Sequence, residues 1–168
     1  RRTVVDCVPS RVRVFPVGRL DLNSSGLMLL TNDGELAARL LHPRYHVEKE
    51  YIVTVRGIVA EAALGRLRRG IHLEDGETAP ASVEVIGQAR PGRAAGAAGS
   101  GTSTTLCITI HEGRKRQIRR MLEAAGHRVV SLHRRRFAGL SDAGLEPGEA
   151  RHLSPAELEE LHRSAFGG

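Results

Sequence analysis

Aromatic residues are scarce in this chain of 168 residues, which has three Phe, two Tyr and no Trp. Proteins that hold RNA by stacking many bases present several aromatic side chains on one surface. The composition therefore excludes a multi-aromatic RNA-binding surface. It leaves room only for a single base held against a single ring.

Cysteines and long apolar runs are also scarce. Cys7 and Cys107 lie far apart and form no paired motif, which argues against a disulfide framework and favours a reducing compartment. No run approaches the ~20 apolar residues of a membrane span, and the chain does not open with a secretory signal pattern. The sequence predicts a cytoplasmic protein without a membrane partner.

Metal-ligand and cofactor motifs are missing as well. His42 and His46 have i,i+4 spacing, but Pro43 lies between them and no third ligand completes a set, so we expect no metal. The sequence has no phosphate-binding glycine loop, no nucleophile elbow and no carboxylate pair of the glycosidase kind. We expect no cofactor.

What the chain has in excess is arginine. The formal net charge is +6, and lysine occurs only at Lys49 and Lys115. The guanidinium fork matches phosphate oxygens in two places at once, which suits a polyanionic partner. Charge alone does not distinguish a nucleic-acid-binding protein from an ordinary basic one.

Hydrophobic periodicity predicts an α+β fold with a mixed, mostly antiparallel central sheet and flanking helices. Asn32 is the expected N-cap of the first helix, with Glu35 three residues later. Ser154 followed by Pro155 and Glu157 predicts the start of the last helix. Expected strands cover 12–17, 27–31, 49–56, 81–86, the segment around 106–110, and 128–137; expected helices cover 35–41, 60–69 and 115–125.

The Ala/Gly/Ser-rich segment 89–103 has no apolar period and predicts a flexible surface insertion between two strands. The helix expected at 115–125 has a buried stripe three and four residues apart. At about 100° per residue, Arg116 and Arg120 point away from that stripe, while Lys115 and Arg119 lie on its shoulders. A solvated basic face and an RNA-contacting face explain Arg116 and Arg120 equally well. A shoulder arginine such as Arg119 could reach a carboxylate in a neighbouring cleft.

Asp21 lies in the stretch VGRLDLNSSG, where a turn between two expected strands is the simplest interpretation. A surface pair with Arg19 would contribute little. However, the segment from Asn23 to Gly26 can form the turn without Asp21, which leaves the aspartate available for another role. Tyr51 begins an expected strand and could simply be a core tyrosine with its hydroxyl at the edge.

Several motifs occur together in one order: PVGRLDLNSSGLMLLTNDGELAARLLHP, EKEYIVTV, EGRKRQIRRML, VVSLHRRRFAGL and PGEARHLSPAEL. This combination resembles the RsuA-like family of ribosomal RNA pseudouridine synthases. The resemblance implies the pseudouridine synthase fold, with a catalytic domain over 1–168 that the 89–103 insertion interrupts. Members usually carry a small N-terminal RNA-binding domain and an opening strand before this point. We expect this chain to lack both.

The resemblance also implies roles for individual residues. Asp21 matches the catalytic aspartate, Tyr51 the tyrosine that stacks on the target base, and Arg119 the basic residue that pairs with the aspartate. Val130 or Leu132 would line the pocket. The remaining expected RNA contacts, made to backbone phosphates, are Arg19, Lys115, Arg116, Arg120, Arg134 and Arg136.

The expected function is isomerisation of a uridine to pseudouridine in ribosomal RNA, without cofactor or metal, with large-subunit RNA slightly favoured. The alternative is a non-catalytic RNA-binding or ribosome-assembly module on the same fold. A buried pair of Asp21 and Arg119 would favour the enzyme. Asp21 could attack the sugar as a nucleophile or abstract a ribose proton, and the sequence does not choose between these roles. The sequence carries no signal for an oligomeric state.

Overall fold

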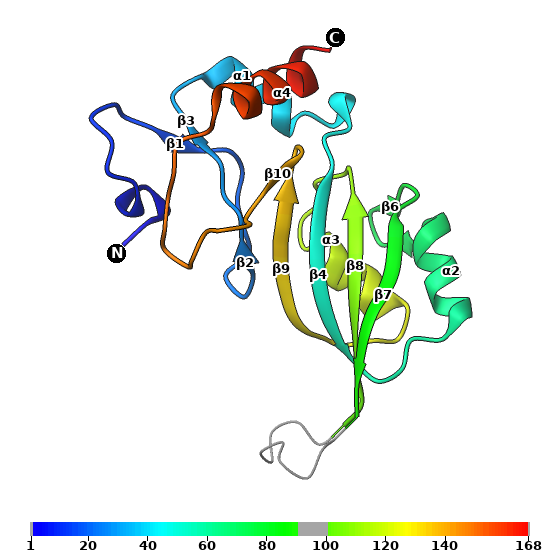
Figure 1. The fold of residues 1–168 in the computed structure, drawn as a ribbon. Coiled ribbons are helices and arrows are strands. Elements are labelled where there is room, and N and C mark those ends of the chain that lie inside the picture. Colours follow the sequence, from blue (N-terminus) through cyan, green and yellow to red (C-terminus); the bar gives the residue numbers. More distant parts are fainter. Residues whose placement is uncertain (1, 91–100, 168) are drawn as a thin grey trace.

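The structure is a computed structural model that describes residues 2–90 and 101–167 (Figure 1). Its main sheet has the strand order β10-β9-β4-β8-β7, and β2 joins the sheet by pairing with β9. Only the β2–β9 pair is parallel; the other neighbouring strands in this sheet are antiparallel. The strands are β2 (Ser25–Gly26), β4 (Lys49–Arg56), β7 (Ser82–Ala89), β8 (Ser103–Ile110), β9 (Val129–Phe137) and β10 (Leu140–Ser141). The predicted α+β class with a mixed, mostly antiparallel sheet is confirmed.

The remaining elements lie around this sheet. Two short antiparallel pairs join β1 to β3 and β5 to β6. No helix in the described part of the chain is long and apolar enough to cross a membrane. The elements are β1 (Phe15–Pro16), β3 (Leu30–Thr31), β5 (His72–Leu73), β6 (Gly76–Glu77), η1 (Val4–Cys7), η2 (Pro43–Tyr45), α1 (Gly34–Leu41), α2 (Glu61–Arg69), α3 (Gln117–Ala124) and α4 (Pro155–Phe166).

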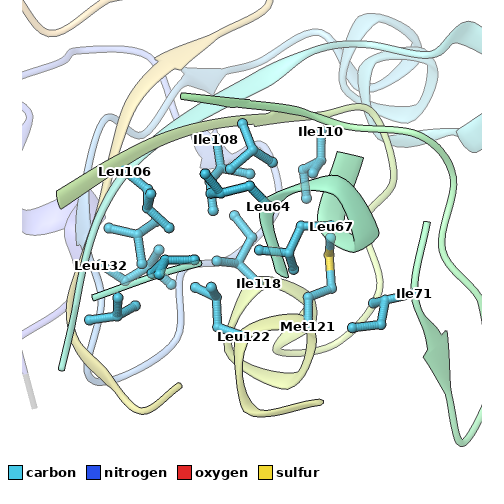
Figure 2. Close-up of a cluster of buried hydrophobic side chains, with 14 of the residues drawn as sticks. Leu64, Leu67, Ile71, Leu106, Ile108, Ile110, Ile118, Met121, Leu122 and Leu132 are labelled. Atoms are coloured by element: carbon cyan, nitrogen blue, oxygen red, sulfur yellow. The ribbon is translucent and has the colours of Figure 1, made fainter. Parts of the chain in front are cut away.

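The main core lies between the sheet and the helices α2 and α3 (Figure 2). Alternate residues of a strand share one face, and helix residues three or four apart share one stripe, so these two patterns meet here. The stripe predicted for α3 is confirmed. Its buried residues Ile118, Met121 and Leu122 belong to one cluster with strand and α2 residues. These are Val53, Val55, Leu64, Leu67, Leu106 and Ile108.

A second core holds α1 and α4 together at the end of β9 (Figure 1). Phe137, the last residue of β9, is fully buried there together with Val17, which comes from the N-terminal segment. This core therefore fixes the segment that leads into Asp21 against the C-terminal end of β9. Its other buried members include Leu29, Leu36, Leu40, Leu140 and Leu161.

The strands β4 and β9 change register by one residue between Glu50 and Tyr51. Glu50 is opposite Arg136 and Tyr51 is opposite Arg134, which leaves Arg135 as an extra residue on β9. Such a bulge lets neighbouring side chains leave the strict alternation of a regular strand. As a result Arg134 shares the core-facing side with Tyr51, while Arg135 pairs with Glu50.

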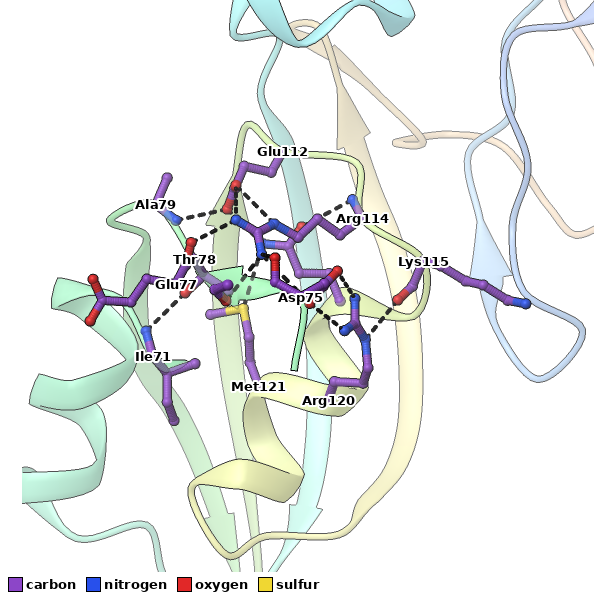
Figure 3. A network of polar contacts seen from close by, with 12 residues as sticks. Ile71, Asp75, Glu77, Thr78, Ala79, Glu112, Arg114, Lys115, Arg120 and Met121 are labelled. Carbon is purple, nitrogen blue, oxygen red and sulfur yellow. Dashed lines mark hydrogen bonds and ion pairs between the residues drawn. The ribbon is translucent and has the colours of Figure 1, made fainter. Parts of the chain in front are cut away.

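A polar network ties the β5–β6 hairpin to the start of α3 (Figure 3). The Arg114 guanidinium donates to the carbonyl oxygens of Gly76 at 3.1 Å and Glu77 at 2.6 Å, and to the Glu112 carboxylate at 3.1 Å. Glu112 in turn accepts from the Ala79 N–H at 2.8 Å and from the Gln117 side chain at 3.0 Å. The network fixes the first turn of α3, from which Arg119 extends.

Several predictions of local structure need correction. The N-cap of α1 is Asp33, whose carboxylate accepts from the Leu36 N–H at 3.1 Å, and not Asn32. The strands expected over 12–17 and 27–31 shrink to β1 and β3, and the β5–β6 hairpin was not predicted. Two-residue strands carry no readable period, and Pro16 has no N–H to extend its ladder. The capping box at Ser154 is confirmed.

The predicted insertion at 89–103 joins two neighbouring strands, because Ala89 of β7 is paired with Ser103 of β8. Its central residues, 91–100, lie outside the described part of the chain. The pairing shows that the segment connects neighbouring strands of one sheet, and the insertion itself stays a prediction.

Candidate active site

Asp21 begins a tight turn. The Ser24 N–H donates to the Asp21 carbonyl oxygen at 2.9 Å, as in a β-turn over residues 21–24. In the described part of the chain, no hydrogen bond or ion pair occupies the Asp21 carboxylate, so neither the Asx-turn nor the surface pair with Arg19 is formed. The backbone forms the turn and the carboxylate is left for other use.

Arg119 reaches this turn from α3. Its Nη2 donates to the Asn23 carbonyl oxygen at 2.8 Å, and the residue is only 9 % exposed. The expected ion pair with Asp21 is absent among the residues described, which corrects that prediction. From its shoulder position on α3, the guanidinium meets a backbone carbonyl of the turn, two residues after the aspartate, and fixes the turn there.

Tyr51 lies on the core-facing side of β4 and packs against the main core. Burial raises the pKa of the Tyr51 hydroxyl, Arg134 opposes that rise, and the Asp21 carboxylate adds to it. The Asp21 carboxylate therefore acts electrostatically on the Tyr51 hydroxyl. The structure brings the predicted Asp21, Tyr51 and Arg119 into one region, although 98 residues of sequence separate the first from the last.

Arg134 lies in the same region, and its position corrects a second prediction. It was expected to contact RNA phosphates, but it is 3 % exposed. Its Nε and Nη2 donate to the Leu27 carbonyl oxygen at 3.0 and 2.7 Å, and its guanidinium lies 4.9 Å from the Phe137 ring centre. Arg134 follows the buried Leu132 by two residues, which is the signal that could have placed it inside.

The other residues expected to contact phosphates differ in whether they already pair with a carboxylate of the protein. Arg19, Lys115 and Arg116 are exposed. Arg120 holds the Asp75 carboxylate with two nitrogens, at 2.7 and 3.2 Å, and Arg136 lies 3.3 Å from Glu50. The last two would have to exchange an internal partner for a phosphate.

The two residues expected to line a pocket have different surroundings. Val130 is 55 % exposed and lines a cavity of about 350 Å³ next to the turn. Leu132 is 6 % exposed and packs in the main core. A pocket-lining role stays a prediction for both.

A chain of side-chain hydrogen bonds behind the turn was not predicted. His133 Nδ1 lies 2.7 Å from the Ser25 hydroxyl, and His133 Nε2 lies 2.5 Å from the Asp142 carboxylate. The three residues meet because β2 pairs with β9 in parallel, with Ser25 opposite His133. No local pattern announces such a contact, since 108 residues separate Ser25 from His133.

Comparison with known protein families shows which family the chain belongs to. The model of the family described as RNA pseudouridylate synthase matches residues 8–124. The chain belongs to the RNA pseudouridylate synthase family. The matched range includes Asp21, Tyr51 and Arg119.

The chain is similar to two bacterial pseudouridine synthases. The chain is 44% identical over 156 residues to "Ribosomal large subunit pseudouridine synthase B" of Bacillus subtilis (strain 168), covering 93% of this chain and 60% of the relative. It is 39% identical over 156 residues to "Ribosomal small subunit pseudouridine synthase A" of Escherichia coli (strain K12), covering 91% and 61%. The chain thus spans about 60% of the length of these pseudouridine synthases.

A solved structure titled "Crystal structure of pseudouridylate synthase" superposes with a TM-score of 0.81 at 34% identity, covering 95% of this chain and 65% of that one. The pseudouridine synthase fold and the family expected from the motifs are both confirmed.

Proposed function

We propose that the chain isomerises a specific uridine of ribosomal RNA to pseudouridine, with Asp21 as the catalytic carboxylate. The observation that carries the proposal is a carboxylate, unpaired among the described residues, presented by a turn that the buried Arg119 holds at the Asn23 carbonyl. This carboxylate also raises the pKa of the Tyr51 hydroxyl. Membership in the RNA pseudouridylate synthase family supports the same reaction. Large-subunit RNA is the favoured substrate, because the Bacillus relative at 44% identity is named for it.

The reaction breaks the bond between ribose C1′ and uracil N1, turns the base, and joins C1′ to C5. The proton on C5 is lost and N1 gains one. Asp21 could attack C1′ and be displaced by C5, or it could remove a ribose proton and return it. Both roles need a carboxylate fixed relative to the sugar, and the Arg119 contact with Asn23 supplies that fixation.

The target uridine must leave its stack to reach Asp21, and a flipped base needs a face to lie against. We assign this role to Tyr51, and a single ring is consistent with a chain so poor in aromatics. The buried Arg134 guanidinium binds the Leu27 carbonyl directly after β2, and its positive charge favours negative charge in this region. The exposed Arg19, Lys115 and Arg116 are free to hold RNA phosphates.

The test is to incubate the protein with large- and small-subunit ribosomal RNA transcripts and to map pseudouridine. We expect product at one uridine with the unchanged chain, and none with Asp21→Asn, while RNA binding persists. Glu77→Gln, which removes an exposed carboxylate on β6, is the matched control and should retain activity. Full activity in Asp21→Asn would refute the assigned role. RNA binding without any product from the unchanged chain would favour the non-catalytic module.

A further inference from the structure

The cavity beside the turn is basic. Its volume is about 350 Å³, and its lining includes three guanidinium groups and one carboxylate. In the described part of the chain, none of these arginines forms an ion pair with any carboxylate, although Glu123 shares the cavity. The residues concerned are Asn23, Arg116, Arg119, Glu123, Arg128 and Val130.

Arg119 is the most buried of the three arginines that line the cavity. It is 9 % exposed and its Nη2 is bound to the Asn23 carbonyl, but its Nε is buried without a hydrogen-bond partner among the residues described. A buried cation without a counter-charge is unfavourable, and a buried donor without an acceptor adds to that cost. An anion beside this guanidinium would supply both the missing acceptor and the missing counter-charge.

Arg116 also lines the cavity and is exposed. It is the N-cap of α3 and adopts a left-handed backbone conformation with φ of 50°. This conformation is uncommon for residues other than glycine, and such strain concentrates at binding sites. The exposed Arg128, just before β9, contributes the third guanidinium from another element.

We propose that this cavity binds a backbone phosphate of the RNA substrate, held between Arg116, Arg119 and Arg128. The proposal rests on the proposed function, because it assigns a position to the RNA strand beside the target uridine. Three guanidiniums against one carboxylate leave an excess of positive charge for one phosphodiester, and guanidinium matches phosphate oxygens in pairs.

A phosphate in this cavity acts on the catalytic turn through one side chain. Arg119 would contact the phosphate and the Asn23 carbonyl with the same planar group, and Asn23 is two residues from Asp21. Binding of the RNA strand in the cavity is thereby coupled to the position of the Asp21 carboxylate. The cavity is thus a strand-positioning site, distinct from the ring that receives the base.

The experiment is ethylation interference on a ribosomal RNA transcript that the protein binds. Phosphates are sparsely ethylated, bound and free RNA are separated, and the positions that prevent binding are mapped. With the unchanged chain we expect interference at a phosphate beside the modified uridine. With Arg128→Gln that position should lose its interference, and the slope of log K against log salt should fall by about 0.7, the value for one single-strand phosphate contact.

Arg66→Gln is the matched control, because it removes the same charge from an exposed position on α2 outside the cavity. It should leave the interference map unchanged. If Arg128→Gln gives the same map and slope as Arg66→Gln, the cavity proposal is overturned, and pseudouridine formation by the unchanged chain would show that the proposed function survives. If the unchanged chain binds RNA but forms no product, the proposed function fails, and the map still decides the cavity.

Discussion

Gly26 lies so close to the backbone of Arg134 that a Cβ on it would be 2.4 Å from the Arg134 carbonyl oxygen. Its φ of +133° is also one that other residues rarely adopt. At this point β2 meets β9 and the turn that begins at Asp21 is attached to the sheet. The contact decides where the candidate catalytic carboxylate lies relative to Tyr51.

Gly26→Ala should therefore separate β2 from β9 and displace the turn. We expect a loss of about 1–3 kcal/mol in the free energy of unfolding, as for other over-packed sites, and a strong loss of pseudouridine formation. Urea unfolding and product mapping measure the two effects. Gly34→Ala is the control, because Gly34 has open space around its Cβ position at the start of α1. Equal unfolding free energies for the two variants would contradict this account.

The hydrogen-bonded chain of Ser25, His133 and Asp142 should position the turn without touching the RNA. Either charge state of the imidazole satisfies both neighbours, since the serine hydroxyl can donate or accept. His133→Ala should lower kcat about tenfold, in line with one or two lost hydrogen bonds, and leave KM nearly unchanged. His133→Asn retains a donor toward Ser25 and should recover part of the rate. His72→Ala, which removes an exposed histidine on β5, is the control. If it changed kcat and KM in the same way as His133→Ala, the effect would not be specific to the hydrogen-bonded chain.

Glu112 should contribute more to stability than an ordinary surface carboxylate. Its side chain is 20% exposed and accepts from Ala79, Arg114 and Gln117. Glu112→Gln should cost about 1–3 kcal/mol, because a partly buried Arg114 loses the nearer of its two charged partners and keeps only Asp75 at 3.6 Å. Glu61→Gln breaks the exposed pair with Arg68 and should cost about 0–1 kcal/mol. Chemical denaturation of both variants under one condition compares them, and a larger loss for Glu61→Gln would be the opposite of what the network requires.

Glu157 should make the stability of α4 sensitive to acid. The Arg151 guanidinium and the Ser154 N–H lower the pKa of Glu157 from 4.5 to about 2. Since the folded pKa lies below the unfolded one, the stabilisation is complete above pH 4.5 and disappears as the pH falls toward 2. The Tm difference between the unchanged chain and Glu157→Gln should shrink over that window. Glu77→Gln lacks the partners of Glu157 and provides the baseline, and a Tm difference constant with pH would disprove the linkage.

Local patterns predicted the elements whose period is long enough to read. The strand β4 was predicted with its observed ends, since Tyr51, Val53 and Val55 alternate with outward residues. The start of α4 followed from Ser154 and Glu157. Elements of two residues have no period, which explains why β2 and the β5–β6 hairpin were not predicted.

The candidate site was likewise predicted only in part. Motif order placed Asp21, Tyr51 and Arg119 in one region, but it did not find the Arg119 contact with Asn23 or the burial of Arg134. Both depend on the docking of β2 against β9, a pairing between residues more than 100 positions apart. Contacts of this kind follow from tertiary structure and have no counterpart in local sequence.

The bulge at Arg135 makes the arginine run tolerant of changes in length. Arg134, Arg135 and Arg136 are identical, so the loss of any one codon gives the same shortened protein. With Leu132 still opposite Val53, the shortened strand would pair regularly: one arginine would face Tyr51, the next would face Glu50, and Phe137 would keep its place opposite Lys49. A deletion that normally flips every later side chain of a strand would here remove only a duplicate partner of Glu50. The gene can therefore lose a codon in this strand more safely than it can exchange the one for Arg134.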